Sequence, residues 1–174
     1  LQLHLNDNYI FLENYSTSEG AMSAYEGFRM ESDVKAGGLN QADLTSDDMY
    51  YTKAEMKSMI QNYRKLGLDI IPEFDTPAHS LSFTKVRPDL RFGTTGRQND
   101  HFNLNTKYDE SLAFVESIWD EYIKGDDPVF DQDTIVNIGT DEYDGQYTEQ
   151  FRKFTDDLLA YIQDNGNTVR LWGS

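Results

Sequence analysis

The chain of 174 residues is 38% hydrophobic and 13% aromatic, enough for one globular domain with a core, which excludes a disordered polypeptide. Its formal net charge of −16 at pH 7 speaks against nucleic acid or an anionic membrane as partner, because both are bound through basic patches. No run approaches the roughly 20 apolar residues of a membrane helix, and the absence of cysteine excludes disulfides and thiolate zinc sites.

Strand patterns alternate with helix patterns along the sequence. In chain order, these patterns predict a strand at residues 3–5, a loop-rich stretch at 9–50 with a short extended piece at 28–32, a helix at 52–66, a strand at 68–71, a polar loop at 73–80, an irregular stretch at 81–108, a helix at 109–123, a strand at 134–138, a helix at 147–163 and a strand at 169–172. Thr52 and Glu55 form a capping-box pair at the first helix, and Gly67 is expected to close it. Pro72 is expected to end the second strand.

This alternation predicts an α/β fold made of parallel βαβ units with right-handed crossovers. No strand–helix junction carries a glycine-rich phosphate loop, which speaks against nucleotide binding. In parallel α/β folds, ligand chemistry gathers at the carboxyl ends of the strands. All four predicted strand ends carry side chains suited to a site: Asp7, then Glu73, Asp75 and His79, then Asp141 and Glu142, then Trp172.

Asp141 and Glu142 follow a near-continuous apolar run with a polar interruption at Asn137, a pattern typical of a strand buried on both faces. Adjacent carboxylates repel each other, so the pair is a poor choice for stability alone. It suits acid/base catalysis, in which one group stays protonated. Paired carboxylates with one histidine and an aromatic wall are typical of glycosidic bond cleavage. No serine lies in a Gly-x-Ser-x-Gly turn, so a serine hydrolase is disfavoured.

A divalent metal site is the main alternative, with Asp7, Asp75, His79, Asp141 and Glu142 as oxygen and nitrogen ligands. The chain has 3 histidines, and none stands in an H-x-H or H-E-x-x-H spacing. The site is therefore predicted to hold no metal, and no cofactor is expected.

Each candidate residue also has a purely structural explanation. Asp7 fits an Asx turn at the end of its strand. His79 fits a helix cap, Asp75 a carboxylate that binds loop N–H groups, and Trp172 an ordinary core residue.

Three further residues stay open on sequence grounds. Glu73, behind Pro72, fits a buried structural acid better than a catalyst. His4 lies in an alternating strand and either faces the site or packs in the core. His101 has no partner that the sequence identifies.

Three strand-end motifs resemble those of glycoside hydrolase family 20, the β-N-acetylhexosaminidases, in order and spacing. These motifs are His4-Leu5-Asn6-Asp7, Pro72-Glu73-Phe74-Asp75-Thr76-Pro77-Ala78-His79 and Ile138-Gly139-Thr140-Asp141-Glu142. Residues 51–55 resemble the start of the family's second barrel helix. The segment 28–32 most resembles the sequences of the bacterial branch, which holds cell-surface hexosaminidases and lacto-N-biosidases. Thr140 and Ala78 are small departures, at positions where many members carry glycine.

The resemblance implies a (β/α)8 barrel, of which this chain supplies roughly strands two to five with their helices. We expect residues 1–174 to be one partial catalytic domain, truncated at both ends. The family's first-strand arginine is expected before residue 1, and further pocket aromatics after residue 174. The isolated piece is predicted to be inactive and to self-associate through its unpaired barrel edges.

The resemblance also implies a retaining, substrate-assisted mechanism through an oxazolinium intermediate. Asp141 would orient the substrate acetamide, and Glu142 would protonate the leaving oxygen and then activate water. His79 and Asp7 match a supporting chain behind the acid, with Asp75 beside them, and Trp172 matches a wall of the N-acetyl pocket.

The implied substrate is a glycan with terminal β-linked GlcNAc or GalNAc, and the implied location is extracellular or at the cell surface. Release of a disaccharide by a lacto-N-biosidase is one alternative. A catalytically inactive glycan-binding module is another, although a lectin has no need of the intact pair Asp141 and Glu142. Nucleic acid binding and membrane insertion are not expected.

Overall fold

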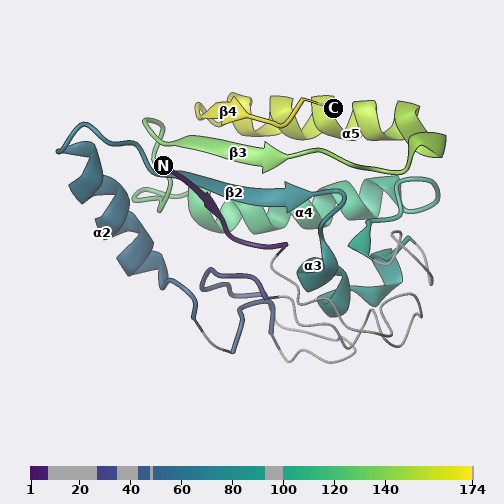
Figure 1. Cartoon of the computed structure of the whole chain (residues 1–174), viewed down its shortest axis with the longest axis horizontal. Coiled ribbons are helices and arrows are strands. Elements are labelled where there is room, and N and C mark those ends of the chain that lie inside the picture. The colour runs from purple at the N-terminus through teal and green to yellow at the C-terminus, as the bar shows by residue number, and fades with distance from the viewer. Residues whose placement is uncertain (8–26, 35–42, 48, 93–99, 174) are drawn as a thin grey trace.

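The computed structural model describes residues 1–7, 27–34, 43–47, 49–92 and 100–173. Within them, a parallel sheet of four strands has the order β1-β2-β3-β4, so each strand lies beside the one before it in the chain (Figure 1). The strands are β1 (Gln2–His4), β2 (Ile71–Thr76), β3 (Ile135–Gly139) and β4 (Thr168–Arg170). This sequential parallel order is the order found along a (β/α)8 barrel.

The predicted helices connect the strands. They are α2 (Lys53–Arg64), α4 (Tyr108–Ile123) and α5 (Thr148–Asp164), of which α4 and α5 lie behind the sheet in Figure 1. The capping box of Thr52 and Glu55 is confirmed, because each side chain accepts a hydrogen bond from the backbone N–H of the other residue. The helix ends earlier than predicted, at Arg64, three residues before Gly67.

The second strand corrects the sequence prediction, since β2 runs through Pro72 to Thr76 and includes the first half of the expected polar loop. Proline is tolerated here because the bonds to β1 use its neighbours: the N–H of Ile71 donates to the Leu1 carbonyl, and the Glu73 carbonyl accepts from Leu5. Pairing with β3 begins only at Glu73. The missing N–H of Pro72 therefore interrupts neither ladder.

The stretch predicted to be irregular, residues 81–108, also needs correction. It contains the short helix α3 (Leu81–Val86) and the 3-10 turn η1 (Pro88–Leu90). All six residues of α3 are buried, so no amphipathic period marks it in the sequence. The extended piece at 28–32 takes part in two isolated parallel bridges, Phe28 with Thr45 and Met30 with Tyr51.

Each strand has an apolar face toward the helices and a polar face on the opposite side, because alternate side chains point in opposite directions. Five buried aromatic side chains form the centre of the apolar side: Phe28, Phe74, Trp119, Tyr122 and Phe130. On β2, Phe74 points into this core, whereas Glu73 and Asp75 lie on the other face and are equally buried. Asn137 interrupts the apolar run of β3 for the same reason.

Among the described residues, no helix combines the length and the apolar character that crossing a membrane requires.

Candidate active site

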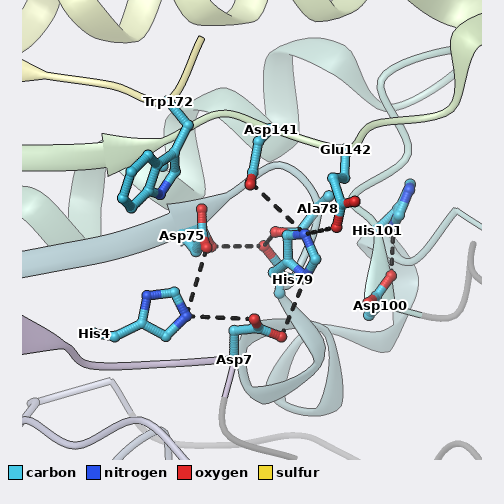
Figure 2. A network of polar contacts seen from close by, with 12 residues as sticks. His4, Asp7, Asp75, Ala78, His79, Asp100, His101, Asp141, Glu142 and Trp172 are labelled. Carbon is cyan, nitrogen blue, oxygen red and sulfur yellow. Dashed lines mark hydrogen bonds and ion pairs between the residues drawn. The ribbon is translucent and has the colours of Figure 1, made fainter. Parts of the chain in front are cut away.

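The carboxyl ends of β1, β2, β3 and β4 bring the predicted site residues together, as Figure 2 shows. The structure places all six at this edge: Asp7, Asp75, His79, Asp141, Glu142 and Trp172. Their positions agree with the sequence prediction, and their chemical roles stay predictions.

His79 lies at the centre of the cluster. Its Nδ1 is 3.2 Å from Asp7 Oδ1, and its Nε2 is 3.2 Å from Glu142 Oε2 and 3.7 Å from Asp141 Oδ1. The contact with Asp7 raises the pKa of His79 to about 9, against the opposing effect of burial. A protonated imidazole therefore joins Asp7 on one side to both adjacent carboxylates on the other.

The backbone around these side chains takes unusual conformations. Asp7, His79, Thr140 and Glu142 have φ angles of 57°, 53°, 66° and 49°, in the left-handed region that non-glycine residues rarely adopt. Such conformations cluster at functional sites, where surrounding contacts hold them. Here Asn6 is one such contact, because its side-chain amide donates to the carbonyls of Asp75 and His79 at 2.8 and 2.9 Å.

Asp75 is the most deeply buried carboxylate of the predicted set, with 2% of its surface exposed. Burial and the nearby charge of Asp141 raise its pKa to about 7. Its side chain lies against Gly139 at the end of β3: a Cβ atom added to Gly139 would stand 2.7 Å from Asp75 Cγ and 2.8 Å from Asp75 Cα. Glycine at this position allows the two strands to place Asp75 next to Asp141.

Asp141 and Glu142 differ in their surroundings although they are neighbours in sequence. The Oδ1 atom of Asp141 is buried and makes no hydrogen bond to any described residue. Burial raises the pKa of Asp141, His79 lowers it, and the net shift is upward. The Glu142 side chain is 66% exposed and lines a hollow of about 530 Å3 together with Trp172. One carboxylate is thus held inside the site, and the other is open to solvent.

Sequence reasoning left His4 and Glu73 open, and the structure brings both into the site. His4 Nδ1 lies 2.5 Å from Glu73 Oε1, and His4 Nε2 lies 3.3 Å from Asp7 Oδ2. The indole N–H of Trp172 donates to Glu73 Oε1 at 3.2 Å. The inward-facing alternative for His4 is therefore correct, and the alternating pattern of β1 was the signal for it.

Tyr143 attaches the loop of the two carboxylates to a distant segment. Its hydroxyl donates to the Phe102 carbonyl at 2.7 Å and accepts from the Leu104 N–H at 3.2 Å. The ring stacks on His101, with centroids 4.9 Å apart, and His101 Nδ1 lies 2.5 Å from Asp100. The partners of His101, which the sequence did not identify, are thus Asp100 and Tyr143.

Two groups have nitrogen and oxygen atoms close enough to hold a metal ion: His4, Asp7 and Asp75, and His79, Asp141 and Glu142. In each group, the pKa of the imidazole is raised, to about 10 for His4 and about 9 for His79, mainly by contact with Asp7. A protonated imidazole is a counter-ion for carboxylates and not a ligand.

A parallel β/α segment with its polar cluster at the carboxyl ends of the strands belongs to the class of (β/α)8-barrel domains. Within that class, the sequence profile of the catalytic domain of glycosyl hydrolase family 20 matches residues 1–173. The chain therefore belongs to glycosyl hydrolase family 20, and the predicted resemblance is confirmed.

Curated relatives and solved structures agree with this assignment. A lacto-N-biosidase of Bifidobacterium bifidum is 24% identical over 145 residues, which cover 71% of this chain and 13% of that protein. The human β-hexosaminidase subunit beta is 31% identical over 113 residues, covering 61% of this chain and 19% of the relative. The chain thus spans less than a fifth of the length of these two relatives.

Solved structures also match the fold, and two of them serve as examples. The match to the Streptomyces plicatus N-acetyl-β-hexosaminidase has a TM-score of 0.62 and 20% identity. It includes 99% of this chain and 32% of the Streptomyces protein. The match to the Flavobacterium johnsoniae chitobiase has a TM-score of 0.63 and 18% identity. It includes 84% of this chain and 25% of the chitobiase. At these identities the likeness concerns the fold, and it confirms the prediction of a partial (β/α)8 barrel.

Proposed function

We propose that this chain is part of the catalytic domain of a glycoside hydrolase that releases terminal β-linked N-acetylhexosamine from glycans. Membership of glycosyl hydrolase family 20 supports the reaction class. The observation that carries the proposal is the position of His79 Nε2, 3.2 Å from Glu142 and 3.7 Å from Asp141, with Asp7 on the opposite side of the ring.

The proposed first step is substrate-assisted. The oxygen of the substrate's 2-acetamido group forms a bond to C1, the glycosidic C1–O bond breaks, and Glu142 transfers its proton to the leaving oxygen. Asp141 accepts a hydrogen bond from the acetamide N–H and stabilises the positive charge of the oxazolinium ion. The buried Oδ1 of Asp141 supports this role, because it accepts no hydrogen bond from any described residue and has only the ion pair with His79 Nε2 at 3.7 Å.

In the proposed second step, water adds to C1 while Glu142 takes its proton, and the oxazolinium ring opens to regenerate the acetamide with retained configuration. His79 and Asp7 hold Glu142 in place through both steps. Trp172, 43% exposed beside the site, forms one wall against the sugar.

The test is Glu142→Gln in the full-length protein that carries this domain, assayed on an aryl β-N-acetylglucosaminide. We expect loss of most of the activity, because the isosteric amide cannot transfer the proton. Glu149→Gln, an exposed glutamate in the first turn of α5, is the matched control and should retain activity. Undiminished hydrolysis by the Glu142 variant would refute the assignment. A thiazoline analogue of the oxazoline should inhibit, and lack of inhibition would refute substrate assistance.

Release of a disaccharide is a second candidate, supported by the relative named lacto-N-biosidase. Comparing aryl β-N-acetylglucosaminide with aryl lacto-N-bioside as substrates separates the two. A glycan-binding module without catalysis predicts a third result: binding of GlcNAc oligomers without turnover of either substrate. Which hexosamine and linkage the protein prefers, and an extracellular or cell-surface location, are predictions from the family resemblance.

A further inference from the structure

We propose that Glu73 and His4 are positioning residues that couple the pocket wall Trp172 to the chain of Asp7, His79 and Glu142. The inference rests on the proposed function. It concerns a second row of side chains, behind those that would touch the sugar.

Glu73, inside β2, connects two side chains of β1 with Trp172, which follows β4. It is 0% exposed, yet its carboxylate faces three donors: the side-chain amide of Gln2, the Nδ1 of His4 and the indole N–H of Trp172. A carboxylate accepts several hydrogen bonds, and burial without such partners would be costly. Since the pKa of His4 is raised to about 10, its ring is protonated at neutral pH and Nδ1 donates to Glu73 Oε1. One buried carboxylate thus holds side chains from β1 and from the end of β4.

His4 continues the connection toward the acid. Its Nε2 lies 3.3 Å from Asp7 Oδ2 and 3.7 Å from Asp75 Oδ2, while Asp7 Oδ1 lies 3.2 Å from His79 Nδ1. The contacts therefore run without interruption from Trp172 through Glu73, His4, Asp7 and His79 to Glu142. Figure 2 shows the part from His4 through Asp7 and His79 to Glu142 as dashed lines, from left to right. The carboxylates that face His4 are Asp7, Glu73 and Asp75, and Asp7 is the largest cause of its raised pKa.

This arrangement gives Glu73 two separable effects. Through Trp172 it orients the ring that would pack on the substrate, which affects KM. Through His4 it stabilises the cation that faces Asp7, and Asp7 in turn holds His79 against the acid, which affects the pH dependence of kcat. A merely structural carboxylate would influence the amount of folded protein and neither of these quantities.

The test is Glu73→Gln in the full-length protein. A glutamine offers one acceptor oxygen and two N–H donors, so it leaves at least one of the three donors unpaired and removes the negative charge beside His4. We expect kcat/KM to fall by about tenfold to a hundredfold, KM to rise, and the alkaline limb of the pH profile to move to lower pH.

Two further variants separate the two effects. Trp172→Phe keeps an aromatic side chain and loses the pyrrole part of the indole with its N–H, so it should raise KM and leave the pH profile unchanged. His4→Asn keeps the contact between Glu73 and Trp172, so it should move the pH profile with little change in KM. Glu149→Gln, at an exposed glutamate in the first turn of α5, is the control, with an expected change below about threefold and an unchanged pH profile.

The outcomes distinguish the inference from the proposed function. An inactive wild type would refute the proposed function. An active wild type whose Glu73 and His4 variants keep the wild-type KM and pH profile, measured on the folded fraction, would overturn the inference. If Glu73→Gln does not fold, His4→Asn alone decides. The His4 imidazole is partly exposed, and after its loss Glu73 Oε1 still accepts a hydrogen bond from the Trp172 indole.

Discussion

Strands β2 and β3 approach each other so closely at Gly139 that a side chain there should lower the free energy of unfolding by a measurable amount. Gly139 has φ +71°, and a Cβ at this position would overlap Asp75, including its backbone Cα at 2.8 Å. Gly139→Ala therefore carries two costs. An L-residue in the left-handed region costs about 1–2 kcal/mol, and an overpacked site costs about 1–3 kcal/mol more. We expect Gly139→Ala to lower the free energy of unfolding by about 2–5 kcal/mol.

Gly67 provides the matched control. Its φ of +77° is nearly the same, but a Cβ at Gly67 would have nothing within 4 Å. Gly67→Ala therefore measures the conformational cost without the overlap. The difference between the two variants, about 1–3 kcal/mol, isolates the contact with Asp75.

Urea denaturation of the full-length protein and of both variants measures this difference, provided that the m values stay equal. Gly139→Ala should also lose activity in the folded protein, because displacement of Asp75 disturbs the neighbouring Asp141, whereas Gly67→Ala should keep it. Equal destabilisation by the two substitutions would refute the reasoning. Asp75 would then have room to move aside, and the glycine would serve the backbone turn alone.

Two further predictions concern the histidines and Tyr143. The pKa values of His4 and His79 are raised to about 10 and about 9, so the stability that the two protonated rings contribute is complete below pH 6.5 and is lost as pH rises through 9 and 10. Urea denaturation between pH 6 and 10 should show this decline in the free energy of unfolding. Asp7→Asn removes the anion that both rings contact, so it should make the decline smaller. Tyr143→Phe removes the hydroxyl that bonds the Phe102 carbonyl and the Leu104 N–H, so it should lower the free energy of unfolding by about 1–3 kcal/mol. It should also lower kcat more than it changes KM. The control Tyr63→Phe, at an exposed tyrosine, should change neither the stability nor kcat.

The sequence predicted the edge of the sheet where the site lies, because that edge follows from topology. Alternating strand and helix patterns imply parallel strands, and parallel strands place their carboxyl ends together. Knowing that order, one can collect Asp7, His79 and the Asp141–Glu142 pair without coordinates. The helix boundaries were predicted equally well where caps and periodicity marked them, as at Thr52.

The prediction failed where a local rule was outweighed by the position of a residue in the fold. Pro72 normally ends a strand, but in β2 its missing N–H falls between the bonds that the ladder uses. Helix α3 is buried on all sides and so has no polar face to reveal its period. Contacts between side chains far apart in sequence, such as Glu73 with Trp172, depend on strand register, which no local pattern encodes.

The two faces of the sheet explain how this arrangement is sustained. Buried carboxylates such as Glu73 and Asp75, together with left-handed residues such as His79, each cost stability. They all lie on one face or at its carboxyl edge, whereas the opposite face buries Phe74 and its aromatic neighbours in one continuous core. Because alternate residues of the same strand serve the two purposes, β2 holds Asp75 in an unfavourable environment with the rigidity that Phe74 gives it. Core substitutions on the helix side of β2 should therefore disturb the site as well as the fold.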